Sequence, residues 1–264
     1  MTDLHHHCLP GVDDGPRTID EAVELCRMSA DEGIETIVAT PHVLRGRWKN
    51  TSRAQLEATL ADLQNRVGNA PRLLLGSEYF FAHDIAEVLR TGGAIIPLAD
   101  SRYILVEFAS NAVPPLVMQP LHAVMLEGWT PIIAHPERNT VFQAKPELVA
   151  ALARVGVKMQ VTTGSLTGEF GEEARTSATQ WLRAGWVHFM ATDAHNRARR
   201  PPRFRTSREI VAGLCGEPVA RALFVDNPRA VVEGRGLPYD PDIPERVEKH
   251  GVMARLREFF GPQS

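Results

Sequence analysis

The sequence predicts an α/β protein whose parallel strands form a closed or nearly closed β/α barrel. Short apolar runs alternate with longer amphipathic stretches along the 264 residues, an order typical of parallel strands joined by crossover helices. Seven such units favour a barrel, whereas the alternative, an open doubly wound sheet, normally binds phosphate at a Gly-rich first turn. The first turn here, His7-Cys-Leu-Pro-Gly-Val-Asp-Asp-Gly15, is of a different kind.

The elements follow one another regularly from the first residues onward. In chain order, the runs that we expect to be strands are Thr2–His5, Ile34–Thr40, Arg72–Ser77, Tyr103–Phe108, Thr130–Ala134, Lys158–Thr162 and Val187–Thr192. The amphipathic stretches between them that we expect to be helices include Asp20–Glu32, Arg53–Val67, Leu116–Glu127, Pro146–Val155 and Glu172–Ala184.

The pattern changes near residue 235, which predicts a barrel over residues 1–235 and a separate tail over 236–264. Gly236–Pro244 is Pro-rich and predicts a linker, and Glu245–Phe260 predicts a short helix. This helix has a loose apolar stripe, which usually means packing on the parent domain, with partner docking as the alternative. The stripe consists of Val247, Val252, Met253, Leu256, Phe259 and Phe260.

Composition excludes several classes of protein. The net charge of −3 lacks the basic footprint that nucleic-acid binding requires. The N-terminus has no basic segment followed by an apolar one, and no apolar run is long enough to span a membrane. The three cysteines, Cys8, Cys26 and Cys215, form no CxxC pair, which argues against a disulfide framework or a structural zinc site. We therefore expect a cytoplasmic protein without membrane insertion.

Residues that can bind a metal recur at the carboxyl ends of six of the seven predicted strands. Because these ends meet on one face of a β/α barrel, residues far apart in sequence are expected to share one pocket. His5 and His7 lie two apart on a strand and share a face, while His6 points away. Mixed imidazole and carboxylate ligands suit Mn, Fe or Zn. The candidates at the strand ends are His5, His7, His42, Glu78, Glu107, His135, Asp193 and His195.

Other reactive residues are weaker candidates. Among the remaining histidines, we expect packing within the fold for His188 and surface positions for His83, His122 and His250, and Cys8 is expected to be a small buried residue. The run Arg197–Arg205 predicts either a solvated face or a phosphate clamp beside the metal site. Cys215 and Arg221 have the C-x5-R spacing of cysteine-dependent phosphatases, but Pro218 removes a backbone donor from the loop. We interpret that match as coincidental.

Several motifs together resemble the polymerase-and-histidinol-phosphatase (PHP) superfamily, and more closely its bacterial tyrosine-protein phosphatase branch linked to capsule and exopolysaccharide synthesis. The likeness keeps its order and spacing from residue 1 to about residue 228. Its motifs are Asp3-x-His5-x-His7, Val12-Asp-Asp-Gly-Pro16, Ala39-Thr-Pro-His42, Gly76-x-Glu78, Leu105-Val-Glu-Phe108, Ile133-Ala-His-Pro-Glu-Arg138, Ala191-Thr-Asp-Ala-His195 and Arg200-Pro-Pro202.

The resemblance implies a distorted seven-stranded β/α barrel that holds two or three metal ions, usually Mn²⁺, with Fe, Zn or Mg as substitutes. It assigns His5, His7, Glu78 and Asp193 to one ion. It assigns Glu78, Glu107 and His135 to a second ion, and Asp14, His42 and His195 to a third. Arg138 and Arg200 match the phosphate-binding arginines of the family, and with His42 they are the expected catalytic residues.

Such a site suits phosphomonoester hydrolysis, because metal ions and arginines spread the charge of the transferring phosphoryl group. The favoured substrate is a phosphotyrosyl protein, namely a tyrosine kinase of polysaccharide synthesis. The alternatives are a small-molecule phosphatase, such as a histidinol phosphatase, and a metal-binding barrel that docks a partner without turnover.

Overall fold

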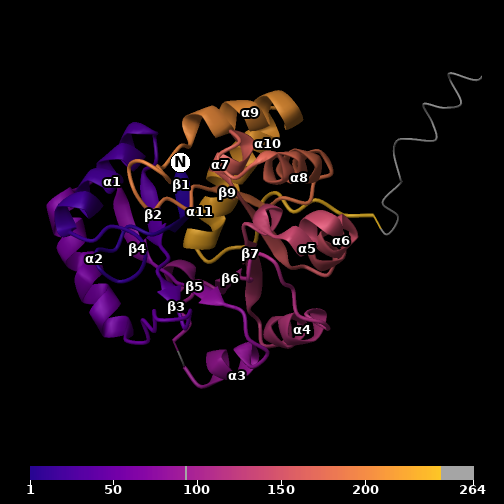
Figure 1. Ribbon diagram of the computed structural model, residues 1–264, viewed down its shortest axis with the longest axis horizontal. Coiled ribbons are helices and arrows are strands. Elements are labelled where there is room, and N and C mark those ends of the chain that lie inside the picture. The colour runs from indigo at the N-terminus through magenta and orange to yellow at the C-terminus, as the bar shows by residue number, and fades with distance from the viewer. Residues whose placement is uncertain (93, 245–264) are drawn as a thin grey trace, which may run out of the picture.

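The computed structural model describes residues 1–92 and 94–244, in which helices surround a core of parallel strands (Figure 1). The strands are β1 (Thr2–His6), β2 (Thr36–Ala39), β3 (His42–Val43), β4 (Arg72–Leu75), β5 (Glu78–Phe80), β6 (Tyr103–Glu107), β7 (Thr130–Ala134), β8 (Lys158–Thr162) and β9 (Phe189–Ala191).

The longer helices are α1 (Ile19–Asp31), α2 (Arg53–Val67), α4 (Met118–Leu126), α6 (Pro146–Arg154), α8 (Glu172–Arg183) and α9 (Arg205–Cys215). The shorter ones are α3 (Ile85–Arg90), α5 (Thr140–Ala144), α7 (Thr163–Leu166), α10 (Glu217–Arg221), α11 (Asn227–Val232), η1 (Leu98–Asp100), η2 (Pro136–Arg138) and η3 (Ala222–Asp226). The parallel α/β architecture predicted from the sequence is confirmed.

The strands form two parallel sheets, ordered β1-β2-β4 and β3-β5-β6-β7-β8-β9. Two predicted strands, Ile34–Thr40 and Arg72–Ser77, are therefore wrong in extent. The first stops before Pro41, which has no N–H for a strand ladder. The second stops before Gly76, where a Cβ would lie 2.8 Å from a methyl carbon of Leu98. The chain resumes as β3 and β5, so His42 and Glu78 begin strands of the second sheet.

The first and last strands lie side by side at their carboxyl ends. An isolated parallel bridge joins His6 to Ala194. The backbone N–H of Asp193 donates to the carbonyl of His5 at 2.8 Å, and that of His7 donates to the carbonyl of Ala194 at 2.9 Å. Consequently, the polar residues that follow β1 and those that follow β9 lie next to one another.

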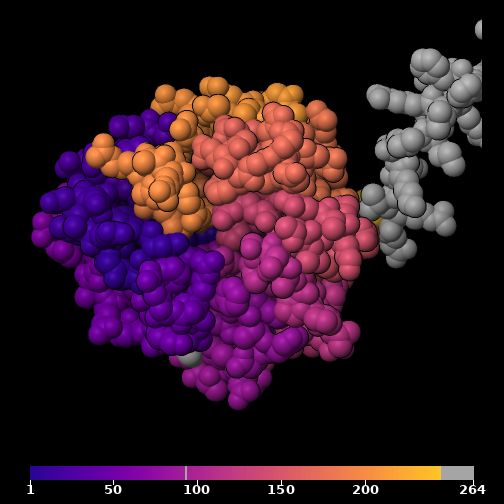
Figure 2. Space-filling model, in the orientation of Figure 1, coloured from indigo at the N-terminus to yellow at the C-terminus, as the bar shows by residue number. Residues whose placement is uncertain are grey.

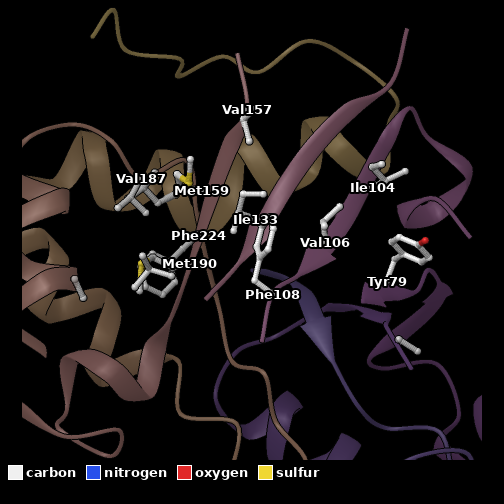
Figure 3. Packing of buried hydrophobic residues seen from close by; sticks show 14 of the residues in the cluster. Tyr79, Ile104, Val106, Phe108, Ile133, Val157, Met159, Val187, Met190 and Phe224 are labelled. Carbon is white, nitrogen blue, oxygen red and sulfur yellow. The ribbon is translucent and has the colours of Figure 1, made fainter. Parts of the chain in front are cut away.

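The larger apolar cluster contains residues of both sheets and of the helices around them. Val106, Ile133, Met159 and Met190 come from β6, β7, β8 and β9, and Figure 3 shows them in one packed layer with Phe224. Strands β6 and β8 are buried at every position, as expected for parallel strands that are covered on both faces. This rigid layer holds the strand ends in place.

The predicted Pro-rich linker packs against the strands as far as it is described. Ile243 is buried in the core, and Asp240 lies 2.6 Å from Lys158 Nζ and 3.3 Å from His188 Nε2. The predicted helix Glu245–Phe260, with its apolar stripe and His250, lies outside the described residues. Within the described part of the chain, no helix is long and apolar enough to cross a membrane.

Candidate metal centre

All nine predicted metal ligands lie together, in or after the ends of β1, β6, β7 and β9 and, for His42 and Glu78, at the starts of β3 and β5. They are buried, except that the side chain of Asp14 keeps 38% of its surface exposed. The ligand atoms fall into groups in which every atom lies within 4.8 Å of the others. The groups are His7, Asp14, His42 and His195; His5, Glu78 and His135; His5, His7 and Asp193; and His42, Glu78 and Glu107.

The first strand places two imidazoles on one side and a third on the other. The Nε2 atoms of His5 and His7 are 3.1 Å apart, while His6 turns away and its Nε2 lies 3.0 Å from Ser29 Oγ in α1. The alternation of side chains along a strand explains this division. The structure therefore agrees with the predicted geometry of the His5-x-His7 pair.

Two of the predicted ligands sit on strained backbone. His135 has φ = 35° and Asp193 has φ = 53°, in the left-handed region that residues other than glycine rarely adopt. Such conformations cost about 1–3 kcal/mol each and persist where the surroundings enforce them, often at functional sites. Both residues lie just after the ends of β7 and β9, where the chain leaves the strand.

A further layer of residues orients the two imidazoles of the first strand. His7 Nδ1 lies 2.8 Å from Asp13 Oδ2, and His5 Nδ1 lies 2.9 Å from Gln160 Oε1 in β8. A metal-binding histidine usually donates its other ring N–H to such an acceptor, which fixes its tautomer. Sequence analysis missed both partners, although Gln160 lies in the one predicted strand that ends without a histidine or carboxylate.

The electrostatics of the pocket favour the binding of cations. Burial and repulsion from Glu78 raise the pKa of Glu107 to about 7. Burial favours the neutral ring of His42, but attraction to Glu78 and Asp14 outweighs it and raises the His42 pKa to about 9. In the same pocket, burial lowers the pKa of His195 to about 4. Without metal, protons thus balance part of the negative charge of the buried carboxylates.

The donor atoms fit divalent metal ions. Asp193 Oδ1 is buried without a hydrogen-bond partner among the described residues, and it lies 3.2 Å from His5 Nε2 and 3.4 Å from His7 Nε2. Likewise, His195 Nε2 is buried without such a partner and lies 3.2 Å from Asp14 Oδ1. Buried polar atoms are seldom left unpaired, so converging lone pairs of this kind indicate bound cations.

Two arginines border the pocket on the side of Asp193. Arg138 and Arg200 both donate to Asp193 Oδ2, and the guanidinium of Arg138 lies 4.2 Å from the ring centre of Phe170. Each remains about one quarter exposed. Their guanidinium groups therefore stand between the metal ligands and solvent, where a phosphate could meet them.

A third arginine, Arg45, also borders the centre and lines one pocket with Arg138; sequence analysis missed it. Its Nε lies 3.0 Å from Glu107 Oε2, and an Nη atom lies 2.6 Å from His42 Nε2. Nearby, the ring of Trp48 stacks on His42 with centroids 5.3 Å apart. The loop after β3 thus covers the centre with a cation and an aromatic ring.

The weaker candidates lie outside the centre. His188 accepts a hydrogen bond from the backbone N–H of Met159 at 3.1 Å, while His83 and His122 are exposed and Cys8 is fully buried. Cys215 ends α9, and the residues after Gly216 form α10, so no phosphate cradle surrounds it. Burial also raises the pKa of its thiol, which disfavours a thiolate nucleophile. The C-x5-R match is coincidental.

The arginine-rich run contributes one residue to the centre, Arg200. Among its other arginines, Arg197 pairs with Glu24 at 2.6 Å, Arg203 pairs with Glu169 at 2.9 Å, and Arg205 donates to the backbone carbonyl of Asp31 at 2.6 Å. These three side chains and Arg199 are exposed, as expected for a solvated face. Phosphate binding by Arg200 stays a prediction.

Comparison with known proteins gives one consistent family. Residues 1–233 match the family model described as capsular polysaccharide synthesis, CpsB/CapC. The tyrosine-protein phosphatase YwqE of Bacillus subtilis is 36% identical over 199 residues, which cover 74% of this chain and 78% of YwqE. The tyrosine-protein phosphatase CpsB of Streptococcus pneumoniae is 31% identical over 239 residues, which cover 88% of this chain and 98% of CpsB.

Comparison with solved structures supports the same family. A crystal structure from a study of YwqE and CpsB, described there as unique metal-dependent tyrosine phosphatases, superposes with a TM-score of 0.87 at 30% identity. The superposition covers 93% of this chain and all of the other. The resemblance inferred from the motifs is thereby confirmed.

Proposed function

This chain belongs to the CpsB/CapC family of capsular polysaccharide synthesis, and from that premise we propose that it is a metal-dependent tyrosine-protein phosphatase. The observation that carries the proposal is the convergence of nine histidine and carboxylate ligands beside two partly exposed arginines. The same chemistry is named for its relatives, which are tyrosine-protein phosphatases.

We assign the residues to two or three Mn²⁺ ions, with Fe, Zn or Mg as substitutes. His5, His7, Glu78 and Asp193 would hold one ion, Glu78, Glu107 and His135 a second, and Asp14, His42 and His195 a third. Glu78 is placed to be shared by two ions, because its Oε1 atom lies 3.3 Å from His5 Nε2 and 3.0 Å from His135 Nε2. Bound ions of this kind supply Lewis acidity and make water nucleophilic near neutral pH.

Arg138 and Arg200 hold the phosphoryl group. A guanidinium fork matches two phosphate oxygens at once, and both forks already converge on one carboxylate oxygen of Asp193. Charge that develops on the phosphoryl oxygens in the transition state is stabilised by these fixed donors.

His42 assists the leaving group when the third ion is absent. Its ring lies 3.3 Å from Asp14 Oδ1, and in the metal-free protein attraction to Glu78 and Asp14 raises its pKa to about 9. A protonated imidazole can donate a hydrogen bond to the departing phenolate. Because the pKa of a tyrosine phenol is about 10, the leaving group needs no stronger acid.

The substrate, the cellular location, the closure of the barrel and the domain bounds are further parts of the proposal. We propose that the substrate is the phosphotyrosyl form of a polysaccharide-synthesis tyrosine kinase, and that the enzyme acts in the cytoplasm, where its three free thiols stay reduced. We also propose that the strands close as a distorted seven-stranded barrel, supported by the bridge between His6 and Ala194. Residues 1–235 would be the catalytic domain and residues 236–264 an appended tail.

A substrate panel tests the function. Metal-loaded protein should hydrolyse a phosphotyrosyl peptide with a kcat/KM well above that for histidinol phosphate. Preference for histidinol phosphate would instead indicate a small-molecule phosphatase. Metal binding without turnover of either substrate would indicate a barrel that only docks a partner.

A further inference from the structure

A cleft of about 620 Å³ opens beside the metal centre at Asp14 and His195. Its walls are the loop from Asp14 to Arg17 with Glu21 of α1, and the loop from His195 to Arg199 after β9. Figure 2 shows the orange surface of the loop after β9 beside the indigo surface of the N-terminal residues. Binding sites for small molecules have volumes of about 300–1,000 Å³, so the cleft has room for a group beyond the reacting phosphate.

Both walls are tied to predicted metal ligands. On one side, a Cβ at Gly15 would lie 2.4 Å from the carbonyl oxygen of His7, so only glycine fits this close approach. On the other side, Asn196 Oδ1 accepts hydrogen bonds from the backbone N–H groups of Ala198 and Arg199 at 3.1 and 2.8 Å. The cleft is therefore a fixed extension of the centre.

Three arginines and two carboxylates line the cleft, namely Arg17, Arg197 and Arg199 with Asp14 and Glu21. Arg197 is paired with Glu24 at 2.6 Å. The carboxylate of Glu21 accepts the backbone N–H groups of Arg17 and Thr18 at the start of α1. In the part of the chain that the structure describes, no carboxylate oxygen forms an ion pair within 4 Å of the guanidinium group of Arg17 or of Arg199. Two free guanidinium groups thus face a cavity whose inner end is the metal centre.

We propose that this cleft is a subsite for a second anionic side chain of the phosphotyrosyl substrate, bound by Arg17 and Arg199. The inference rests on the proposed function and extends it to the sequence around the phosphotyrosine. The anion is a neighbouring aspartate or glutamate, or a second phosphotyrosine, since a guanidinium binds a carboxylate and a phosphate by the same two-pronged geometry. A small aryl phosphate does not extend into the cleft.

The test compares three peptides that differ only in the residue beside the phosphotyrosine, which is alanine, aspartate or a second phosphotyrosine. The wild-type enzyme should show a higher kcat/KM for the two anionic peptides, and added salt should reduce the difference because the arginines are exposed. The double variant Arg17→Ala/Arg199→Ala should lose about tenfold of this preference, as expected for two exposed ion pairs. Whichever anionic peptide loses more identifies the ligand.

Two controls make the test decisive. Turnover of p-nitrophenyl phosphate should stay unchanged in the double variant, and Arg66→Ala/Arg175→Ala, which removes two exposed arginines elsewhere, should behave as wild type. The subsite is overturned by equal kcat/KM values for all three peptides, or by a parallel loss for p-nitrophenyl phosphate. If the wild-type enzyme hydrolyses none of the phosphotyrosyl peptides, the proposed function itself has failed.

Discussion

Replacing Asp13 by asparagine should weaken metal binding although Asp13 is not among the proposed ligands. Its Oδ2 atom lies 2.8 Å from His7 Nδ1 and accepts the backbone N–H of His42 at 3.2 Å, while Oδ1 accepts the N–H of Gly15 at 2.9 Å. Asparagine keeps one acceptor oxygen and replaces the other with an NH₂ group. Whichever way the amide turns, the N–H of His7 or that of Gly15 loses its acceptor, and a neutral amide holds the His7 N–H less strongly than a carboxylate does. The tautomer of His7 with its proton on Nε2, where the metal should bind, therefore becomes more accessible.

The loss should be about 10- to 100-fold in metal affinity or kcat/KM, the usual effect of removing an acceptor behind a metal-binding histidine. This range equals about 1.4–2.7 kcal/mol. Metal affinity would be measured by competition with a fluorescent chelator, and turnover with a phosphotyrosyl peptide. Asp20→Asn, on the exposed first turn of α1, is the matched control. Wild-type metal affinity together with wild-type turnover in Asp13→Asn would refute this account of His7.

Four further predictions follow from the same geometry. Replacing either phosphate-facing arginine, for example Arg138→Ala, should raise KM, lower kcat or both, with metal content at the wild-type level; loss of metal would show that the arginine supports the ligands instead. Cys215→Ser should keep most activity towards phosphotyrosyl peptide, and a stable, fully metallated but dead variant would overturn the metal mechanism. The pKa of His42 is raised from 6.5 to about 9, so its contribution to the stability of the metal-free protein should be lost as pH rises through about 9. Metal must displace that proton, so affinity should rise up to about tenfold per pH unit between pH 7 and about 9 and then level off; a flat profile in chelator competition would contradict this. Cutting the chain after Pro238 should lower the melting temperature, because it removes the packed segment up to Pro244, whereas cutting after Pro244 tests the tail alone; there, lost stability would indicate packing, and unchanged stability with slower kinase dephosphorylation would indicate docking.

The grouping of the candidate ligands could be predicted from the sequence because a parallel α/β fold brings the carboxyl ends of its strands together. Knowledge of where each apolar run ends was therefore enough to gather His5, Glu78 and Asp193 into one pocket. The errors in strand extent did not change this grouping. Pro41 and Gly76 shift the strand boundaries but not the face on which the candidate ligands lie.

The supporting residues could not be found in the same way. Gln160 contacts His5, which is distant in sequence, and Arg45 contacts His42 and Glu107. Neither glutamine nor arginine indicates metal chemistry by itself. The pair Asp13 and Asp14 shows the limit clearly, because adjacent carboxylates look alike in sequence. The family resemblance selects Asp14 as the ligand, but only the structure shows that Asp13 is buried behind His7 whereas Asp14 is partly exposed.

The Pro-rich segment before the tail shows a similar limit. Its composition predicts a linker, but Asp240 pairs with Lys158 and the backbone carbonyl oxygens of Ile243 and Pro244 accept hydrogen bonds from Arg154. These partners lie about 80–90 residues away in sequence, beyond any local pattern. Proline fixes the path of such a segment but does not say what it packs against.

The central claim is that bound metal ions, held by the nine converging ligands, are required for phosphotyrosine hydrolysis. The most direct test is to strip the protein with EDTA, verify its metal content, and measure phosphotyrosyl peptide turnover before and after adding Mn²⁺. The account predicts that turnover falls to background in the stripped protein and returns in proportion to the metal bound. Full activity in a sample shown to be free of metal would contradict it.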